Sequence, residues 1–174
     1  MSLKYSIAGL ILAISVPLAA LAHGPKALPE DPELLNRYKA GYAAYQQSDY
    51  ATALKEWRPL AEKGNSAPQL FIGFMYDKGQ GVARDDSVAA DWYRKSAERD
   101  NMIAQVRLAI MYREGRGVAE DRVKAWFWAG MAARKEDHMH RIGKALQRDL
   151  KAVMTPEELA EAEALLRAQA KKHE

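Results

Sequence analysis

Residues 72–76 read IGFMY and residues 108–112 read LAIMY, and the turn after each reads GQGVA at 79–83 and GRGVA at 115–119. The two passages are offset by 36 residues, and the same offset relates further aspartates, alanines and tryptophans. These matched positions are Asp85 with Asp121, Ala89 with Ala125, Trp92 with Trp128, and Ala97 with Ala133. A period of about 20 to 50 residues is typical of stacked repeat proteins. We therefore predict that residues 68–133 contain two copies of one helix-turn-helix unit.

Local signals indicate where the helices of these copies begin and end. We expect a helix A at about 67–78 and again at 103–114, and a helix B at about 85–99 and again at 121–134. Within each copy, the glycine-containing turn separates helix A from helix B. The predicted fold is therefore a series of antiparallel helix pairs.

Several residues of the repeat have a structural explanation. Asp85 and Asp121 are expected to cap the B helices, because an aspartate side chain accepts the free amides of the first turn. Gly79 and Gly115 are expected to end the A helices in the left-handed conformation. Gly73 is expected to be small because helices A and B approach closely there.

The offset extends weakly toward the N terminus, where a shorter helix pair is expected. Its second helix contains Pro59, which removes one backbone hydrogen bond and is predicted to bend the helix without breaking it. Gly64 is expected to follow the end of that helix. The expected segments are a signal peptide at 1–22, an extended leader at 23–31, a first repeat at 32–65, two further repeats at 66–101 and 102–136, and capping helices at 137–174.

The first 22 residues have the pattern of a secretory signal. Lys4 precedes an apolar run at 7–21, which Pro17 interrupts, and residues 20–22 read Ala-Leu-Ala, a small-x-small cleavage pattern. Cleavage would leave His23 as the first residue and would place the protein in the periplasm or outside the cell. The alternative is an uncleaved membrane anchor, but the run is shorter than the roughly 20 apolar residues that span a bilayer.

Composition limits the possible functions. The chain has 174 residues, no cysteine, 26 basic and 23 acidic side chains, and a formal net charge of +3. Disulfides and lipid attachment at a signal-site cysteine are therefore excluded, and stability must come from buried apolar surface. The balanced charge also argues against a nucleic-acid partner, which requires a one-sided basic surface.

Residues 68–133 resemble Sel-one-like repeats. That family pattern is Ala-x-x-x-Leu-Gly-x-x-Tyr, then Gly-x-Gly-Val, an Asp three residues on, and Ala-x-x-Trp/Tyr-x-x-x-Ala-Ala. The departures are Ile72 for Leu, Pro68 for the first Ala, and Ala109 for Gly. Residues 37–64 look closer to a tetratricopeptide unit. The resemblance implies an all-α, right-handed solenoid that acts as a protein-interaction scaffold, as in bacterial cell-envelope and signalling adaptors.

In tetratricopeptide-like arrays the A helices line a concave groove, so the resemblance indicates where a partner would bind. We expect the groove to be aromatic toward the N terminus and basic toward the C terminus, suited to a peptide with apolar anchors and an acidic residue. The candidate partner-binding residues are Tyr38, Tyr42, Tyr45, Phe71, Phe74, Arg107, Ile110 and Arg113. The alternative is that the aromatic side chains only fill space between neighbouring A helices.

Three tryptophans could also suggest ligand stacking. Trp92 and Trp128 occupy matching repeat positions, so we expect both in the core. Trp126 has no counterpart in the other copy and could cover the junction with the C-terminal helices.

No enzyme, cofactor or metal site is expected. The Gly79-x-Gly81 turn lacks the strand and the Gly-Lys-Ser/Thr of a phosphate-binding loop. His138 and His140 are two residues apart, so on a helix their side chains point to nearly opposite sides. The sequence therefore predicts a non-catalytic scaffold of the cell envelope, and the alternative function is a periplasmic glycan- or peptidoglycan-binding module, because tyrosine-lined grooves also stack sugars.

Overall fold

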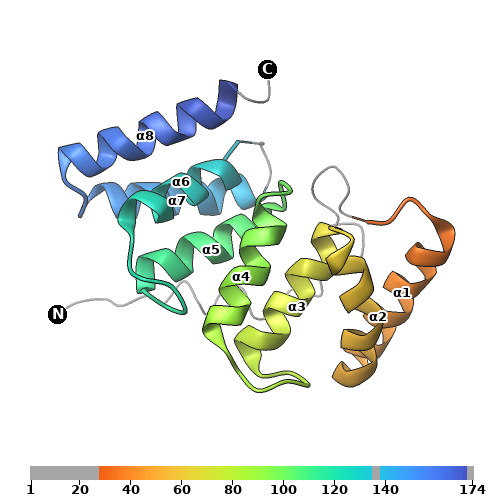
Figure 1. Ribbon diagram of the computed structural model, residues 1–174. Helices are drawn as coiled ribbons and strands as arrows, with labels where there is room; N and C mark the ends of the chain where they lie inside the picture. Colours follow the sequence, from red (N-terminus) through yellow and green to blue (C-terminus); the bar gives the residue numbers. More distant parts are fainter. Residues whose placement is uncertain (1–27, 135–137, 172–174) are drawn as a thin grey trace.

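The computed structural model describes residues 28–134 and 138–171. The expected signal peptide at 1–22 and most of the expected leader at 23–31 lie outside the described residues. Within them the chain forms eight helices and no strand, so the predicted all-α class is confirmed (Figure 1). The helices are α1 (Pro32–Gln46), α2 (Tyr50–Glu62), α3 (Ser66–Lys78), α4 (Asp86–Ala97), α5 (Met102–Glu114), α6 (Arg122–Ala132), α7 (His138–Lys151) and α8 (Pro156–Lys171).

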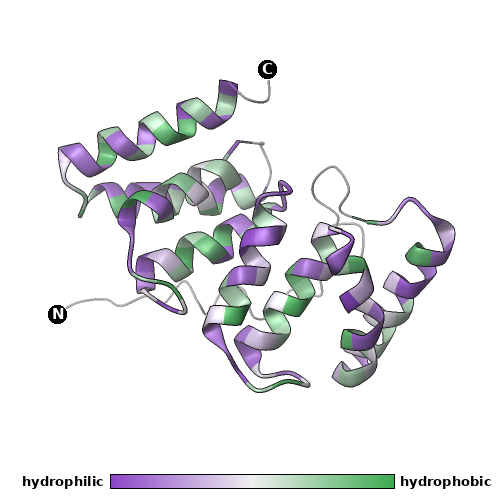
Figure 2. Ribbon diagram, viewed as in Figure 1, coloured by the Kyte–Doolittle hydropathy of each residue, from purple (hydrophilic) through white to green (hydrophobic). Residues whose placement is uncertain are grey.

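The helices stack in chain order into an α-solenoid. The pairs are α1 with α2, α3 with α4, and α5 with α6, and α2–α3 and α4–α5 contacts join each pair to the next. At the C-terminal end α7 packs on α6, and α8 turns back onto α6 (Figure 1). Hydrophobic and hydrophilic residues alternate along the helices in Figure 2, as expected for helices that bury one side.

Aspartate side chains cap four of the eight described helices, α1, α2, α4 and α6, including the two caps that the sequence predicts in the repeats. The Asp85 carboxylate accepts hydrogen bonds from the backbone amides of Ser87 and Val88, and the Asp121 carboxylate accepts one from the amide of Lys124. At the other end of α3 and α5, Gly79 and Gly115 adopt φ angles of 68° and 63°. Both capping predictions are therefore confirmed.

These caps make stability sensitive to acid. The amide of Val88 and then the Ser87 side chain lower the pKa of Asp85 from its ordinary value of 3.8. Thr52 lowers the pKa of Asp49, which caps α2, by the same kind of hydrogen bond. Because the folded pKa values are depressed, the contribution of these carboxylates is present above the unfolded pKa and is lost as pH falls through the folded pKa.

We expect the melting temperature to fall between about pH 5 and about pH 2, and the double variant Asp49→Asn/Asp85→Asn to show a shallower fall over the same range. Asparagine is also a good N-cap, so the variant should remain folded at neutral pH. Thermal denaturation followed by circular dichroism across this range measures the effect. An unchanged slope in the variant would assign the acid sensitivity to other carboxylates.

Close approach of the two helices in a pair explains two small residues. A Cβ at Gly73 would lie 2.6 Å from the ring of Tyr93, which is completely buried, and a Cβ at Gly41 would lie 2.6 Å from the ring of Trp57. The expectation for Gly73 is therefore confirmed. At the positions 36 residues after Gly73 and Tyr93, the chain has Ala109 and Ala129, both buried. In the α5–α6 pair, two alanines therefore stand where the α3–α4 pair has a glycine and a large ring.

Each long turn also rests on the preceding repeat. Gly81 contacts Tyr50, the first residue of α2, and Gly117 contacts Asp86, the first residue of α4. Tyr50 and Asp86 are themselves 36 residues apart. A contact between a turn and the start of the previous helix B is therefore made at the same place in both repeats.

The remaining helix predictions concern α2 and the C-terminal helices. Helix α2 continues through Pro59, so the helix is not broken there. A capping box begins α8: the Glu158 carboxylate accepts a hydrogen bond from the Thr155 amide, and the Thr155 hydroxyl accepts one from the Glu158 amide. Leu166 of α8 packs against Gly130 of α6 and covers the end of the array.

Candidate functional site

An aromatic cluster occupies the junction between α1, α2 and α3. Phe71 lies at its centre and stacks on Trp57, with ring centroids 4.4 Å apart and an interplanar angle of 20°. The rings of Tyr42 and Tyr45 approach Phe71 at 5.8 and 5.5 Å, and Phe74 lies 6.2 Å away. The predicted aromatic residues of α1 and α3 are therefore brought together in space.

The burial of Tyr38 and Phe71 corrects their assignment as surface residues. Tyr38 is 0% exposed and Phe71 is 4% exposed, so neither offers a surface to a partner. The physical reason is the indole of Trp57, which stacks on Phe71 and lies 6.3 Å from Tyr38. Each ring gains more by burial against Trp57 than by exposure to water. For these two residues the packing alternative holds.

Tyr45 remains half-buried and is fixed by hydrogen bonds. Its hydroxyl donates to Oε1 of Gln80 at 2.8 Å, and Nε2 of Gln80 donates to the Tyr50 hydroxyl at 3.1 Å. Burial and then the nearby Tyr50 raise the pKa of Tyr45, against the smaller lowering effects of Gln80 and Arg107. Tyr45 is therefore a neutral, oriented phenol next to the aromatic cluster.

Phe74 and Arg107 form the contact between the aromatic and basic parts of the predicted site. The guanidinium carbon of Arg107 lies 5.0 Å from the centre of the Phe74 ring, within the range of a cation–π interaction. Phe74 is half-buried, and its ring makes a T-shaped contact with Tyr93, with ring centroids 5.6 Å apart. The Arg107 side chain is 16% exposed, and its Nε has no hydrogen-bond partner among the described residues.

A buried carboxylate, which sequence reasoning missed, lies beneath Arg107. The side chain of Asp77 is 1% exposed and forms a short ion pair with Arg116. The Tyr93 hydroxyl donates to it at 3.2 Å, and Arg107 lies 3.9 Å from it. A signal was present in the sequence, because the positions of Asp77 and Gln80 in one copy hold Arg113 and Arg116 in the next.

The last two predicted residues follow Arg107 along α5. Ile110 is half-buried and packs against the second hydrophobic cluster of the molecule. Arg113 is 29% exposed and pairs with Glu114 at 3.0 Å, which offsets part of its charge. We define the A-helix face as the six predicted residues that are not fully buried: Tyr42, Tyr45, Phe74, Arg107, Ile110 and Arg113.

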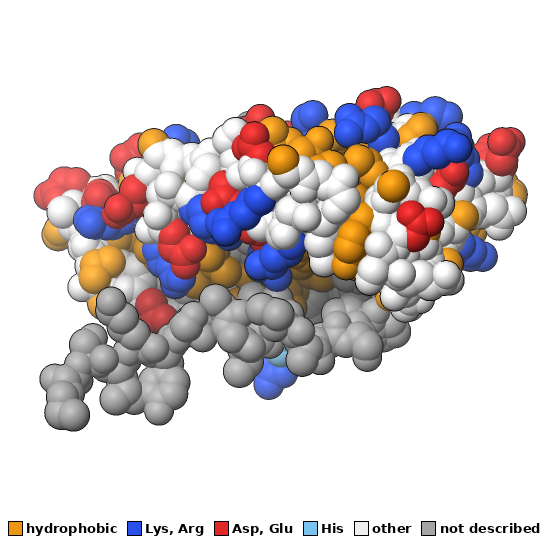
Figure 3. Space-filling view, turned by 90° about the horizontal axis from the view of Figure 1, so that it is seen from below, with side chains coloured by type: hydrophobic (Ala, Val, Ile, Leu, Met, Phe, Trp, Pro, Cys, Tyr) orange, Lys and Arg blue, Asp and Glu red, His pale blue; other side chains and the backbone are white. Residues whose placement is uncertain are grey.

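Charge and hydrophobicity are mixed on the molecular surface. Seen from below, a band of hydrophobic atoms runs across the middle of the molecule, and Lys, Arg, Asp and Glu side chains are interspersed around it (Figure 3). None of the described helices is both long and apolar enough to cross a bilayer. Among the same residues, no three His, Asp or Glu side chains are grouped so that they could hold a metal ion.

The tryptophans differ from expectation in one respect. Trp92 and Trp128 are only half-buried and pack at the edge of the core. The completely buried ring of α4 is Tyr93, which lies on Gly73. Trp126 is also half-buried, and its indole N–H has no partner among the described residues.

Comparison with known proteins identifies the repeats. A family model described as Sel1 repeat matches residues 69–101 and 103–137. A search of curated proteins gave no match.

Two solved structures are similar to this chain. One is a protective antigen present in uropathogenic Escherichia coli strains that displays an SLR fold, with a TM-score of 0.73 and 29% identity over 81% of this chain and 30% of that chain. The other is a Sel1 repeat protein from Oxalobacter formigenes, with a TM-score of 0.51 and 34% identity over 53% of this chain and 38% of that chain. This chain therefore spans well under half the length of either solved protein.

Sel1 repeat proteins generally act as protein-interaction scaffolds and are generally non-catalytic. The matched segments coincide with the helix pairs α3–α4 and α5–α6. The glycines, capping aspartates and buried alanines of these pairs recur at the same offset in sequence and in structure. Residues 69–101 and 103–137 of this chain are therefore Sel1 repeats.

Proposed function

We propose that the protein is a non-catalytic scaffold of the bacterial cell envelope that binds a protein or peptide segment on the A-helix face. The observation that supports this proposal is the arrangement at Phe74 and Arg107, where a partly exposed ring lies under a guanidinium group. Aromatic residues and arginine dominate the energetics of protein interfaces. Tyr45 adds an oriented phenol at the same place.

The charge around Arg107 favours a partner with an acidic group. Asp77 is shared by Arg116, Arg107 and Lys78, and its closest ion pair is with Arg116. One buried carboxylate therefore faces several cations, and the positive charge of Arg107 is only partly offset. An acidic side chain of a partner could accept a hydrogen bond from Arg107 while an apolar side chain covers Phe74.

The cell-envelope location rests on residues 1–22 and is part of the proposal. Signal cleavage would leave His23 at the N terminus. Sequencing the N terminus of the protein recovered from a periplasmic fraction tests the location, and recovery of an intact Met1 from the cytoplasm would contradict it.

The test of the binding face uses two conservative variants. Arg107→Gln removes the charge but keeps the length of the side chain, and Phe74→Leu removes the ring but keeps an apolar residue. We expect each variant to weaken capture of the envelope partner at least tenfold, with a melting temperature close to that of the parent protein. Quantitative pull-down from envelope extract, paired with thermal denaturation, measures both properties.

The matched control is Arg58→Gln, which makes the same change at an exposed position on α2. It should leave capture unchanged. If Arg107→Gln and Phe74→Leu lower the melting temperature in parallel with capture, these residues act in packing. If purified muropeptides bind the protein and no envelope protein does, the glycan-binding alternative is correct.

A further inference from the structure

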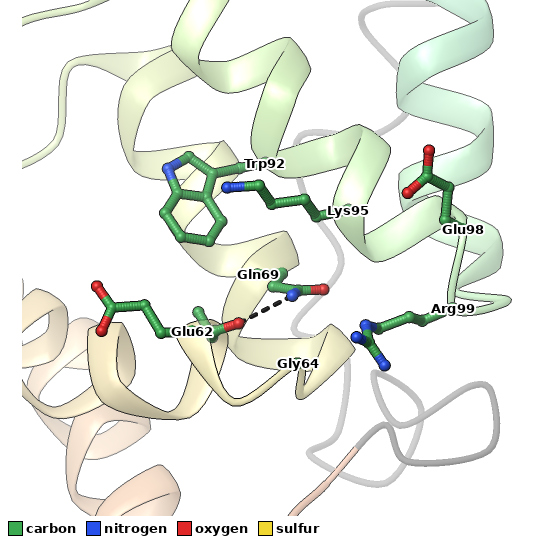
Figure 4. Close-up of a pocket in the computed structure, with 8 residues that line it drawn as sticks. Glu62, Gly64, Gln69, Trp92, Lys95, Glu98 and Arg99 are labelled. Atoms are coloured by element: carbon green, nitrogen blue, oxygen red, sulfur yellow. Dashed lines mark hydrogen bonds between the residues drawn. The ribbon is translucent and has the colours of Figure 1, made fainter.

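A hollow with a volume of about 330 Å³ opens between the C-terminal ends of α2 and α4 (Figure 4). Glu62 of α2 and Trp92 and Lys95 of α4 line it, together with Glu98 and Arg99, which follow α4. The A-helix face shares no residue with this hollow. A volume near 300 Å³ is at the small end of the range for ligand sites in proteins.

The hollow lies where the two repeats differ in sequence. Lys95 corresponds to Met131 at the offset of 36 residues, and Trp92 corresponds to Trp128. Met131 is 5% exposed, so at the next junction this position is filled by a buried apolar side chain. Lys95 instead is exposed and extends over the Trp92 ring, with Nζ 4.2 Å from the ring centre. The repeat fold itself does not require a lysine there.

A buried amide forms part of the wall. Gln69 is 3% exposed, and its Nε2 donates to the carbonyl of Ala61 at 2.9 Å (Figure 4). Its Oε1 has no hydrogen-bond partner among the described residues. Gln105 makes the equivalent bond to Ala97 and leaves its Oε1 in the same state, so the amide belongs to the repeat. Gln69 differs from Gln105 in having a charged hollow beside it. A hydrogen-bond donor of a ligand in this hollow could reach Oε1 of Gln69.

Four charged side chains line the hollow, two of each sign. They are Glu62 and Glu98, and Lys95 and Arg99. No ion pair joins any of the four to another described residue, and Lys95 contacts the Trp92 ring instead. Opposite charges that line one hollow without pairing leave both signs available to a ligand.

We propose that this hollow binds a small zwitterion, which is a free amino acid or a dipeptide with an apolar side chain. The carboxylate lies between Lys95 and Arg99, the ammonium donates to Oε1 of Gln69 and to Glu62, and the apolar side chain packs against Trp92. A purely anionic ligand would supply no donor for Gln69 and would face both glutamates. A purely cationic ligand would face Lys95 and Arg99.

Titration of the protein with phenylalanine, glycyl-phenylalanine, N-acetyl-phenylalanine and phenylalaninamide tests the ligand class. We expect saturable binding of at least one of the first two, measured by calorimetry and by the shifts of the tryptophan indole signals in NMR. Whichever of these two compounds binds more tightly shows whether the site takes a free amino acid or a dipeptide. Loss of either charge, in the acetylated or amidated compound, should weaken binding at least tenfold.

Substitutions then locate the site. Lys95→Met installs the residue of the next repeat and should abolish binding while the helical content is unchanged. Glu62→Gln, at an exposed position, should weaken binding of the zwitterion several-fold and leave that of N-acetyl-phenylalanine unaffected. Lys144→Met makes the same change as Lys95→Met on α7, away from the hollow, and should bind like the parent protein.

Three results would overturn the proposal. They are no saturable binding of phenylalanine or glycyl-phenylalanine at millimolar concentration, equal binding of the free and N-acetylated compounds, and unchanged binding in Lys95→Met. Binding of N-acetylglucosamine in preference to the zwitterions would assign the hollow to sugars. All these outcomes are independent of the partner-binding test on the A-helix face, because the two sets of variants share no residue.

Discussion

Replacing Gly117 with alanine is expected to lower the free energy of unfolding by about 3 kcal/mol. Gly117 has a φ of 70°, which disfavours any residue with a side chain. A Cβ there would also overlap the backbone carbonyl of Asp86 and would lie 2.8 Å from the amide of Ser87. Backbone atoms at the start of α4 cannot rotate away as a side-chain end can, so the turn and α4 must separate.

Gly115 provides a matched control within the same turn. Its φ is 63°, similar to that of Gly117, but a Cβ there would meet no atom closer than 3.5 Å. Gly115→Ala should therefore cost about 1 kcal/mol, from the backbone conformation alone. Urea denaturation followed by circular dichroism measures both variants, and equal losses would show that the contact with Asp86 does not fix the spacing of the repeats.

Replacing Asp77 with alanine is expected to cost about 3 kcal/mol of stability. The substitution leaves Arg116 and Arg107 without their buried carboxylate and removes the acceptor of the Tyr93 hydroxyl. Removal of one partner of a buried ion pair typically costs about 3 to 5 kcal/mol. The lower end applies because the Arg116 side chain is 26% exposed and water can solvate its freed charge.

Two further variants separate the charge from the space it occupies. Asp77→Asn keeps the volume and an acceptor for Tyr93 but removes the charge, so its loss of stability should be smaller than that of Asp77→Ala. The double variant Asp77→Ala/Arg116→Met should lose less than the two single variants together, because the interaction is removed only once. Additive losses in denaturant titrations would mean that Asp77 and Arg116 contribute independently.

The features that the sequence predicts correctly are local ones. Gly79 and Gly115 end helices, and Asp85 and Asp121 begin them, through contacts with residues only a few positions away. Such contacts depend on the identity of a residue and its immediate neighbours. A period of 36 residues then repeats these local signals, and the stacking of helix pairs follows.

The features that it does not reveal depend on contacts between repeats. Helical spacing places Phe71 and Phe74 on one side of α3, but only the position of Trp57 on α2 decides that Phe71 is buried. Asp77 likewise acquires its partner Arg116 from the next repeat, 39 residues away. Spacing within one helix carries no information on which neighbouring helix covers which of its sides.

Differences between the copies mark several of these contacts. Asp77, Gln80 and Lys95 all have chemically different counterparts 36 residues later, and each makes a contact that its counterpart does not. Phe71 is an exception, because it differs from Arg107 and yet packs in the core. A difference between copies therefore indicates a position to inspect in three dimensions, and burial decides its role.

The stacking of helices in chain order has a consequence for the kinetics of folding. Each helix packs mainly on those next to it in sequence, and α8 also turns back onto α6. Short loop closures are entropically cheap and rapid, so topologies of this kind fold quickly. The order in which the ribosome delivers the helices is also the order in which they can assemble. The aromatic cluster of the first junction can therefore form before α8 has been synthesised.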